Sequence, residues 1–158
     1  MAPLDAILET ADGEISVRKL LDGCPAVLAL WASWCGPCLI EKAGEAQMAR
    51  RLAKAGARTR ILLIQAYDEK PLDEAIALLK RIGAKDLPSV RATPAAEKLF
   101  LNYFGASTPT SDRPLMPSIM LADSDGTVLG RAVGMMKAKR LRKDYWYDDA
   151  TFDFLSGL

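Results

Sequence analysis

Histidine is absent from this 158-residue sequence, and its absence excludes several kinds of site. A Ser-His-Asp or Cys-His catalytic arrangement cannot be built within the chain, and neither can a zinc or copper site that depends on imidazole. The chain also lacks an excess of charge of either sign, because 21 basic and 20 acidic residues leave a formal charge of +1. Without the basic excess that phosphate neutralisation requires, nucleic acid is not expected as a partner.

Long hydrophobic runs are missing as well. The longest apolar stretch, residues 26–32, is far shorter than the roughly 20 residues of a membrane-spanning helix. The first residues show no basic segment followed by an apolar core. We expect a soluble chain, which is either cytoplasmic or an extracytoplasmic chain from which a signal or anchor segment has been removed.

Apolar residues make up half of the sequence, enough to bury the core of a single domain spanning residues 1–158. Residues 26–31 are continuously apolar and predict a strand covered on both faces, whereas residues 37–55 carry apolar positions at helical spacing. The other expected elements are a hairpin over residues 7–17, a short helix over 18–22, extended segments over 60–65 and 87–90, helices over 73–82, 94–104 and 149–155, and a hairpin over 118–133. This order predicts an α/β fold with a mixed sheet.

The sequence Cys35-Gly36-Pro37-Cys38 lies between the expected buried strand and the long helix. Both sulfurs then fall in the first helical turn, close enough to form a small disulfide ring. Unpaired backbone N–H groups and the positive end of the helix dipole stabilise a thiolate there, which predicts Cys35 as the exposed nucleophile. Cys38, one turn farther inward, is the expected resolving thiol.

This cysteine pair predicts thiol–disulfide exchange. Cys35 would attack a partner disulfide, and Cys38 would then attack Cys35 and release the reduced partner, while the reverse steps would oxidise a dithiol. No dissociable cofactor and no metal are expected. A zinc site would need two further Cys or His ligands, and only Cys24 remains.

The run from Trp31 to Cys38, WASWCGPC, resembles the active-site signature of the thioredoxin superfamily. The surrounding order of elements resembles the TlpA/ResA-type branch, which consists of extracytoplasmic bacterial thiol-disulfide proteins. The resemblance implies a thioredoxin-like fold, in which a central mixed β-sheet is flanked by helices. It also implies an N-terminal hairpin extension in residues 1–25 and a helical insertion and loop in residues 67–115, before a cis-proline loop.

Further site residues follow from this resemblance. Met116-Pro117 and the hairpin after it are similar to the family's cis-proline loop. The resemblance implies a cis peptide before Pro117, placed against the two sulfurs, with the backbone of Met116 helping to position a strand of the partner. Trp34 would shield the sulfurs, Pro37 would tune the stability of the disulfide, and Gly134 looks like the family glycine after the last strand.

Glu41 follows Cys38 by three residues and lies on the same helical face. A carboxylate there can exchange a proton with the inner thiol, and a dry environment would raise its pKa toward neutrality. The TlpA/ResA-type pattern carries a glutamate at this spacing. The alternative is a solvated glutamate that is favoured near the helix N-terminus by the macrodipole.

Three positions depart from the family pattern. Ala29 stands where typical thioredoxins carry a buried aspartate, so their proton relay does not transfer and the extracytoplasmic branch is favoured. Ala43 replaces the helix proline, so the usual kink is not implied. Cys24 is an odd thiol, for which an inert role stands against a redox or intermolecular role.

Two surface features have alternative interpretations. The loop of residues 105–115 leads into Pro117, so its polar tip would either border the partner groove and contribute to substrate choice or serve as a solvated spacer. The aromatic residues 145–147 follow a basic run at 137–143. They indicate either packing under the terminal helix or a patch for nucleic acid or membrane.

We therefore expect a thiol-disulfide oxidoreductase that acts as a monomer on protein disulfides or dithiols. The resemblance implies reduction of specific extracytoplasmic clients, such as apocytochromes c or copper-site assembly proteins, with electrons from a membrane thiol reductase. The alternatives are a thioredoxin-fold binding module, a copper metallochaperone that uses the two thiolates, and a peroxiredoxin. The missing histidine weakens a stable copper site.

Overall fold

The computed structural model describes residues 2–133 and 146–158. Gly134, the basic run at 137–143 and Tyr145, on which predictions were made, lie outside the described residues. The elements in chain order are η1 (Pro3–Asp5), β1 (Ile7–Thr10), β2 (Gly13–Ser16), α1 (Val17–Leu21), β3 (Ala26–Trp31), α2 (Gly36–Lys54), β4 (Arg60–Gln65), α3 (Leu72–Arg81), β5 (Ser89–Ala92), α4 (Pro94–Phe104), β6 (Ser118–Ala122), β7 (Val128–Val133) and α5 (Asp149–Ser156).

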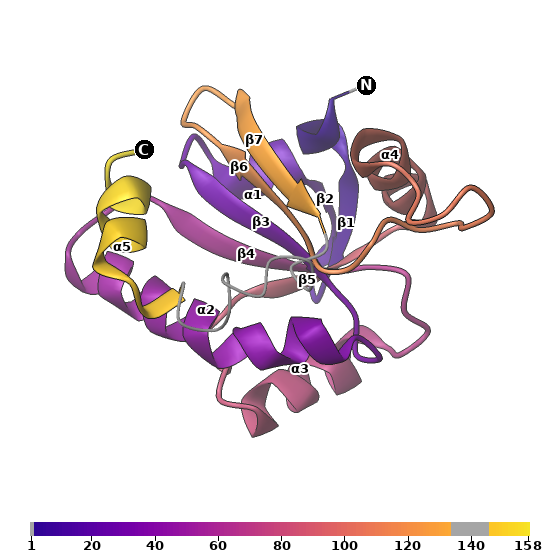
Figure 1. Cartoon of the computed structure of the whole chain (residues 1–158), viewed down its shortest axis with the longest axis horizontal. Helices are drawn as coiled ribbons and strands as arrows, with labels where there is room; N and C mark the ends of the chain where they lie inside the picture. The colour runs from indigo at the N-terminus through magenta and orange to yellow at the C-terminus, as the bar shows by residue number, and fades with distance from the viewer. Residues whose placement is uncertain (1, 134–145) are drawn as a thin grey trace.

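The strands form one seven-stranded mixed sheet in the order β2-β1-β5-β4-β3-β6-β7. The pairs β3–β4 and β4–β5 are parallel, and the other neighbours are antiparallel. The chain steps in one direction across the sheet from β3 to β5, so right-handed crossovers place α2 and α3 on the same face. The return to β6 places α4 on the opposite face, as Figure 1 shows.

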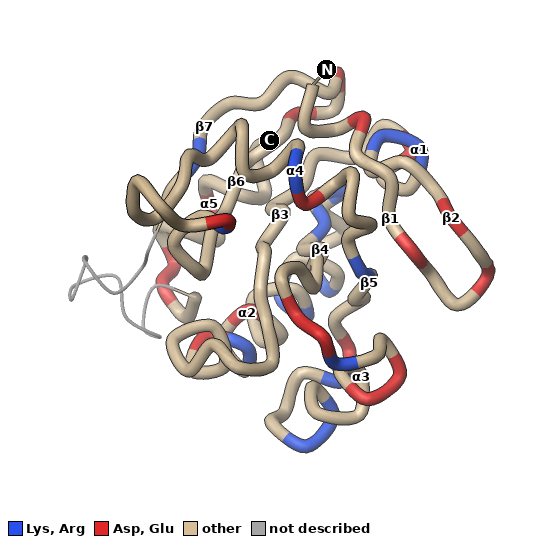
Figure 2. Tube along the Cα trace, turned by 90° about the vertical axis from the view of Figure 1, so that its right-hand side faces the viewer, with Lys and Arg blue, Asp and Glu red and all other residues tan. Residues whose placement is uncertain are grey.

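Strand β3 is buried along its whole length, as its apolar run predicts. It pairs with β4 on one side and with β6 on the other, so that Leu28 faces Leu62 and Met120 in the register. The tube in Figure 2 carries no charged residue on β3 or β6, whereas charges of both signs are spread over the helices and the β1–β2 hairpin carries only acidic residues. The centre of the sheet is therefore apolar, and α2 packs against the sheet at β4.

The β5 strand lies two residues later than the sequence predicts. Pairing decides its position, because Ser89 aligns with Leu63 of β4 and Ala92 aligns with Leu8 of β1. Pro88 precedes the strand and contributes its carbonyl, which accepts the Leu63 N–H. Strand β1 pairs with β5, so the N-terminal hairpin extends the main sheet by two strands and β2 forms its edge.

The C-terminal helix α5 packs against α2. Trp146 is buried at 2% exposure, which confirms the packing interpretation for this residue, whereas Tyr147 is 48% exposed and does not pack in this way. The Thr59 hydroxyl donates a hydrogen bond to the Leu155 carbonyl at 2.5 Å and ties α5 to the start of β4. Within the described residues, none of the helices is both long and apolar enough to span a bilayer.

We predict that Leu28→Ala lowers the free energy of unfolding by about 2–5 kcal/mol, because it leaves a cavity in the middle of the sheet. Leu129→Ala on β7 is the matched control, since Leu129 is 51% exposed. It should change the free energy by no more than about 0.5 kcal/mol. Urea unfolding of both variants measures the difference, and similar losses would contradict this assignment of the core.

Candidate active site

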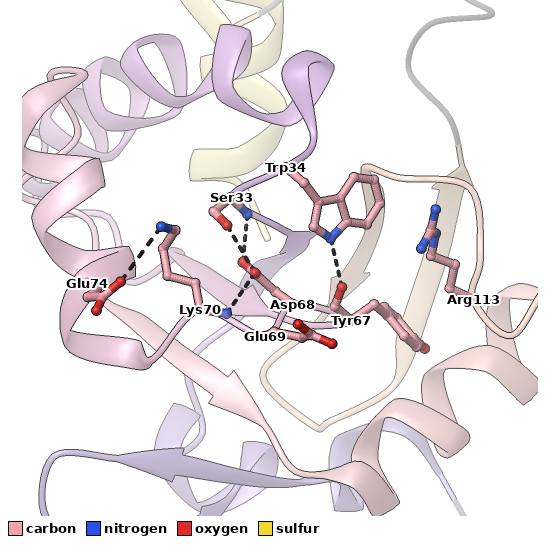
Figure 3. A pocket seen from close by; sticks show the side chains of 8 residues that line it. All are labelled: Ser33, Trp34, Tyr67, Asp68, Glu69, Lys70, Glu74 and Arg113. Atoms are coloured by element: carbon pink, nitrogen blue, oxygen red, sulfur yellow. Dashed lines mark hydrogen bonds and ion pairs between the residues drawn. The ribbon is translucent and has the colours of Figure 1, made fainter.

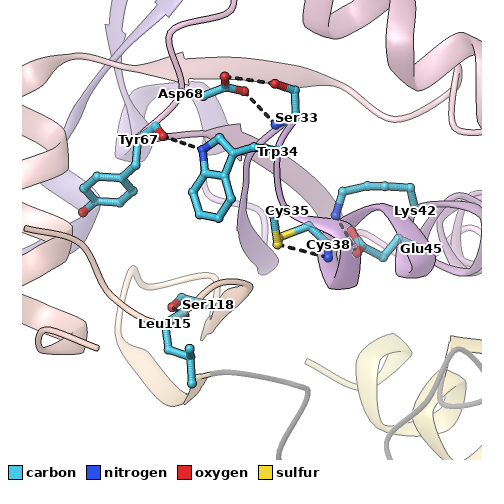
Figure 4. The surroundings of a disulfide bond; sticks show 10 residues. All are labelled: Ser33, Trp34, Cys35, Cys38, Lys42, Glu45, Tyr67, Asp68, Leu115 and Ser118. Carbon is cyan, nitrogen blue, oxygen red and sulfur yellow. Dashed lines mark hydrogen bonds and ion pairs between the residues drawn. A yellow bond between two sulfur atoms is a disulfide. The ribbon is translucent and has the colours of Figure 1, made fainter. Parts of the chain in front are cut away.

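The N-terminus of α2 brings the two motif cysteines together. Cys35 is the N-cap of the helix, and its Sγ accepts a hydrogen bond from the Cys38 N–H at 3.2 Å. The two residues form a disulfide with a Cα–Cα distance of 5.3 Å. Gly36 begins the helix and Pro37 occupies its first turn, where a missing N–H leaves no hydrogen bond unmade. The predicted pairing is confirmed (Figure 4).

The prediction that Cys35 is exposed is wrong for this disulfide form. Cys35 is 3% exposed and Cys38 is 0% exposed. Both cysteines belong to the buried core of the protein, so packing around the disulfide covers Cys35 as well as Cys38. Cys35 remains the more accessible of the two sulfur-bearing residues.

Trp34 stands beside the disulfide and is 47% exposed. Its indole N–H donates a hydrogen bond to the Tyr67 carbonyl at 2.7 Å. The Arg113 guanidinium lies over the indole ring, 4.3 Å from its centroid. Arg113 belongs to the loop of residues 105–115, so this loop reaches the active site, which favours the partner-groove interpretation over the spacer. Figure 3 shows Trp34 between these two contacts.

Asp68 fixes the segment that leads into Cys35. Its carboxylate accepts hydrogen bonds from the Ser33 N–H at 2.7 Å and from the Ser33 hydroxyl at 3.0 Å. Burial alone would raise the pKa of Asp68, but the hydrogen bonds from Ser33, Gln65 and Lys70 outweigh it and hold the pKa below its usual value. The sequence analysis did not single out Asp68, because its contact with Ser33 joins segments 35 residues apart.

A surface hollow of about 570 Å³ opens on the outer side of Trp34. Its walls come from the segment before α2, the β4–α3 connection, the start of α3 and the 105–115 loop. The lining residues are Ser33, Trp34, Tyr67, Asp68, Glu69, Lys70, Glu74 and Arg113 (Figure 3). Polar and charged side chains therefore surround the exposed face of Trp34.

The Met116–Pro117 peptide is cis, as the resemblance implies. Ser118 aligns with Leu30 in the antiparallel β3–β6 pair, so Pro117 lies at the edge of the sheet where β3 leads into the cysteine motif. The Ser118 hydroxyl donates to the Leu115 carbonyl at 2.7 Å, and Met116 is buried. In Figure 4 this loop lies across from the disulfide.

Glu41 is buried at 4% exposure, so the solvated alternative is wrong. Burial is the main cause that raises its pKa to about 7, and the Glu45 carboxylate adds to the increase. The Lys42 ammonium and a hydrogen bond involving Trp146 act in the opposite direction. A carboxyl group with this pKa can accept or release a proton near neutral pH.

Two charged residues that the sequence analysis missed lie beside Glu41. The Lys42 Nζ and the Glu45 Oε1 are 3.0 Å apart, and their side chains are 0% and 1% exposed. The spacing of Cys38, Glu41, Lys42 and Glu45 is a helical stripe, and this was the available signal. Only the packing of α2 shows that the stripe faces the interior.

Cys24 is a free, partly buried thiol at the opposite end of β3 from the motif. The six residues of β3 separate the two ends by about 20 Å, so Cys24 is not part of the disulfide site. Its Sγ lies 4.0 Å from a guanidinium nitrogen of Arg58. Within the described residues, no three Cys, Asp or Glu side chains gather in a way that would hold a metal ion.

No protein-family model matches this chain. Among solved structures, a thioredoxin-family thiol:disulfide interchange protein from Chlorobium tepidum is similar at 24% identity and a TM-score of 0.66, over 99% of both chains. The exposed lipoprotein thioredoxin of Streptococcus pneumoniae is similar at 20% identity and a TM-score of 0.63, over 96% of this chain and 98% of that one.

A secreted disulfide oxidoreductase of Mycobacterium tuberculosis, homologous to E. coli DsbE, is similar at 18% identity and a TM-score of 0.59. The match covers 98% of this chain and 94% of that one. Likeness at this level of identity concerns the fold, and it agrees with the strand order and the position of the disulfide. The chain therefore has the thioredoxin-like fold.

Proposed function

We propose that this protein is a thiol-disulfide oxidoreductase that acts on the disulfides of other proteins. The observation that carries the proposal is the Cys35–Cys38 disulfide at the N-terminus of α2, with the cis Met116–Pro117 peptide at the same edge of the sheet. Cysteines at a helix N-terminus have a lowered thiol pKa, and thiolates are the species that exchange disulfides.

The reaction starts from the reduced protein. The Cys35 thiolate, stabilised by the Cys38 N–H and the helix N-terminus, attacks one sulfur of the client disulfide, and the other client sulfur leaves as a thiolate. Cys38 then loses its proton to Glu41 and attacks the Cys35 sulfur. The Cys35–Cys38 bond forms and the bond to the client breaks. The client leaves with both electrons on its two sulfurs, one of which takes up the proton held by Glu41 and the other a proton from solvent.

The other predicted site residues support these two steps. Trp34, fixed by Tyr67 and Arg113, limits the approach of water and of the client to one side of the sulfurs. Gly36 leaves the start of the helix open, since nothing lies within 4 Å of the place where its Cβ would be. Pro117 has no N–H, and the backbone of Met116 is therefore the group that guides an extended client segment.

We infer that the clients are specific extracytoplasmic proteins, such as those of cytochrome c maturation or metal-site assembly. One structural neighbour is described as secreted and another as an exposed lipoprotein, which supports this compartment. A reductase in that compartment needs an electron source, and a membrane thiol reductase would supply one. The protein would act as a monomer, with residues 1–158 as a single domain.

Reduction of insulin by dithiothreitol tests the proposed function, because precipitation of the B chain reports protein-disulfide reduction. Cys35→Ser should reduce the rate to that of dithiothreitol alone, since the nucleophile is lost. Cys38→Ser should accumulate a mixed disulfide between Cys35 and insulin, which intact-mass spectrometry detects. Without the resolving thiol, turnover should then fall by at least about tenfold.

Cys24→Ser is the matched control, because Cys24 lies at the other end of β3. This variant should keep the full rate. Catalysis that survives in Cys35→Ser would overturn the proposed function.

A substitution of Arg113 tests whether the loop of residues 105–115 contributes to substrate choice. Arg113→Ala removes the cation–π contact with Trp34, and such contacts are worth about 0.5–1 kcal/mol at exposed sites. We predict a loss of about two- to fivefold in the rate toward a protein disulfide, with no change toward a small aromatic disulfide. Arg81→Ala on α3, also an exposed arginine, should affect neither rate. Equal losses toward both substrates, or none, would contradict a role of the loop in substrate choice.

A further inference from the structure

The Lys42–Glu45 pair has no part in the proposed reaction, yet both of its charges are fully buried. Their side chains are 0% and 1% exposed, and one oxygen of the Glu45 carboxylate has no hydrogen-bond partner. Removing two charges from water is costly, and a pair of apolar residues is often an equally stable replacement. Stability alone therefore gives no reason for this pair.

The position of the pair indicates a different role. Cys38, Glu41, Lys42 and Glu45 occupy positions i, i+3, i+4 and i+7 of α2, so their side chains share one face of the helix. Lys42 also lies against the Trp31 ring at the end of β3, with its Nζ 5.8 Å from the centroid. Figure 4 shows the pair farther along α2 from Cys38.

Among residues 2–133 and 146–158, the charged groups that act on Glu41 are those of the pair itself. Glu45 raises the proton affinity of Glu41 and Lys42 lowers it. Trp31 faces the stripe from β3, and Trp146 faces it from the segment before α5, and both are uncharged. Asp149 of α5 pairs with Arg51, which lies about 15 Å along the helix from Glu41.

The two members of the pair therefore have opposite effects on the same carboxyl group. If Lys42 had no partner, it would pair with Glu41 and hold it as a carboxylate that accepts protons poorly. If both members were absent, the two effects would be removed together, and the proton affinity of Glu41 would return close to its original value. The buried pair thus acts as a balanced dipole beside the proton acceptor.

We propose that the Lys42–Glu45 ion pair is a positioning element that sets the proton affinity of Glu41, and with it the pH range in which Cys38 resolves the mixed disulfide. The proposal rests on the proposed function. In the step concerned, the Cys38 thiol proton passes to Glu41 and the Cys38–Cys35 bond forms. The Cys35–client bond breaks, and its electron pair leaves on the client sulfur.

Stopped-flow reaction of the reduced Cys24→Ser protein with Ellman's reagent isolates this step. The first equivalent of thionitrobenzoate reports attack by Cys35, and the second, released in a unimolecular phase, reports resolution by Cys38. The rate of the second phase is recorded from about pH 5 to about pH 9. Glu41→Gln identifies the inflection that belongs to Glu41, because that inflection is absent from the profile of this variant.

Glu45→Gln should move this inflection to lower pH by about one unit or more, which is a tenfold loss of proton affinity. The double variant Lys42→Met/Glu45→Gln should return the inflection to within about half a unit of the parent value. Asp86→Asn is the matched control, since it disrupts the exposed Arg50–Asp86 pair, and it should leave the profile unchanged. Thermal unfolding of each oxidised variant verifies that it is folded.

The outcomes separate the two proposals. If the parent releases no second equivalent of thionitrobenzoate, the proposed function itself fails. A normal second phase with the same inflection in the parent and in Glu45→Gln overturns the role of the pair alone. A double variant whose inflection stays as low as that of Glu45→Gln, or an inflection that persists in Glu41→Gln, overturns it as well, because the balance of the two charges would then not set the inflection.

Discussion

The capping contact at the start of α2 is the constraint on which the site depends. One sulfur, the Cys35 Sγ, both accepts the Cys38 N–H and bonds to the Cys38 Sγ. This geometry requires that the strand leading into the helix be held in place, and only residues 32–35 separate β3 from α2. The β3 strand meets this requirement because it is buried along its whole length and is paired on both sides. Its register with β6 also places Pro117 at the same edge.

Three charged side chains of α2 are buried behind the cysteine pair. Ala29 lies in β3 where typical thioredoxins carry an aspartate, and the buried acidic residues of the described chain, Glu41 and Glu45, lie on α2 instead. Glu41 and the Lys42–Glu45 pair occupy the dry face of that helix behind Cys38. In the proposed mechanism, a proton that leaves the inner thiol passes to Glu41 one helical turn away, on the same element as the sulfur itself.

Local patterns predicted most of the fold, because continuous apolar runs and helical spacing are local properties. The bounds of β3, β4 and α4 agree with the sequence analysis, and β6 and β7 together span the predicted hairpin. The predicted position of β5 was two residues too early because its pairing with β1 and β4 depends on residues far away in the sequence. The same reason applies to the Asp68 clamp on Ser33 and to Arg113 over Trp34. The low exposure of Cys35 and the burial of Lys42 depend on packing, which spacing along one helix does not reveal.

The equilibrium between the Cys35–Cys38 disulfide and its dithiol tests the central claim most directly. The Cys24→Ser protein would be equilibrated in glutathione buffers of known poise, and the oxidised fraction would be measured by mass after alkylation. We predict a two-electron transition at about −270 mV or below, as expected of a reductase that an upstream donor keeps reduced. A potential closer to about −120 mV would contradict the reducing role, and failure to form this disulfide at any poise would contradict the proposed activity altogether.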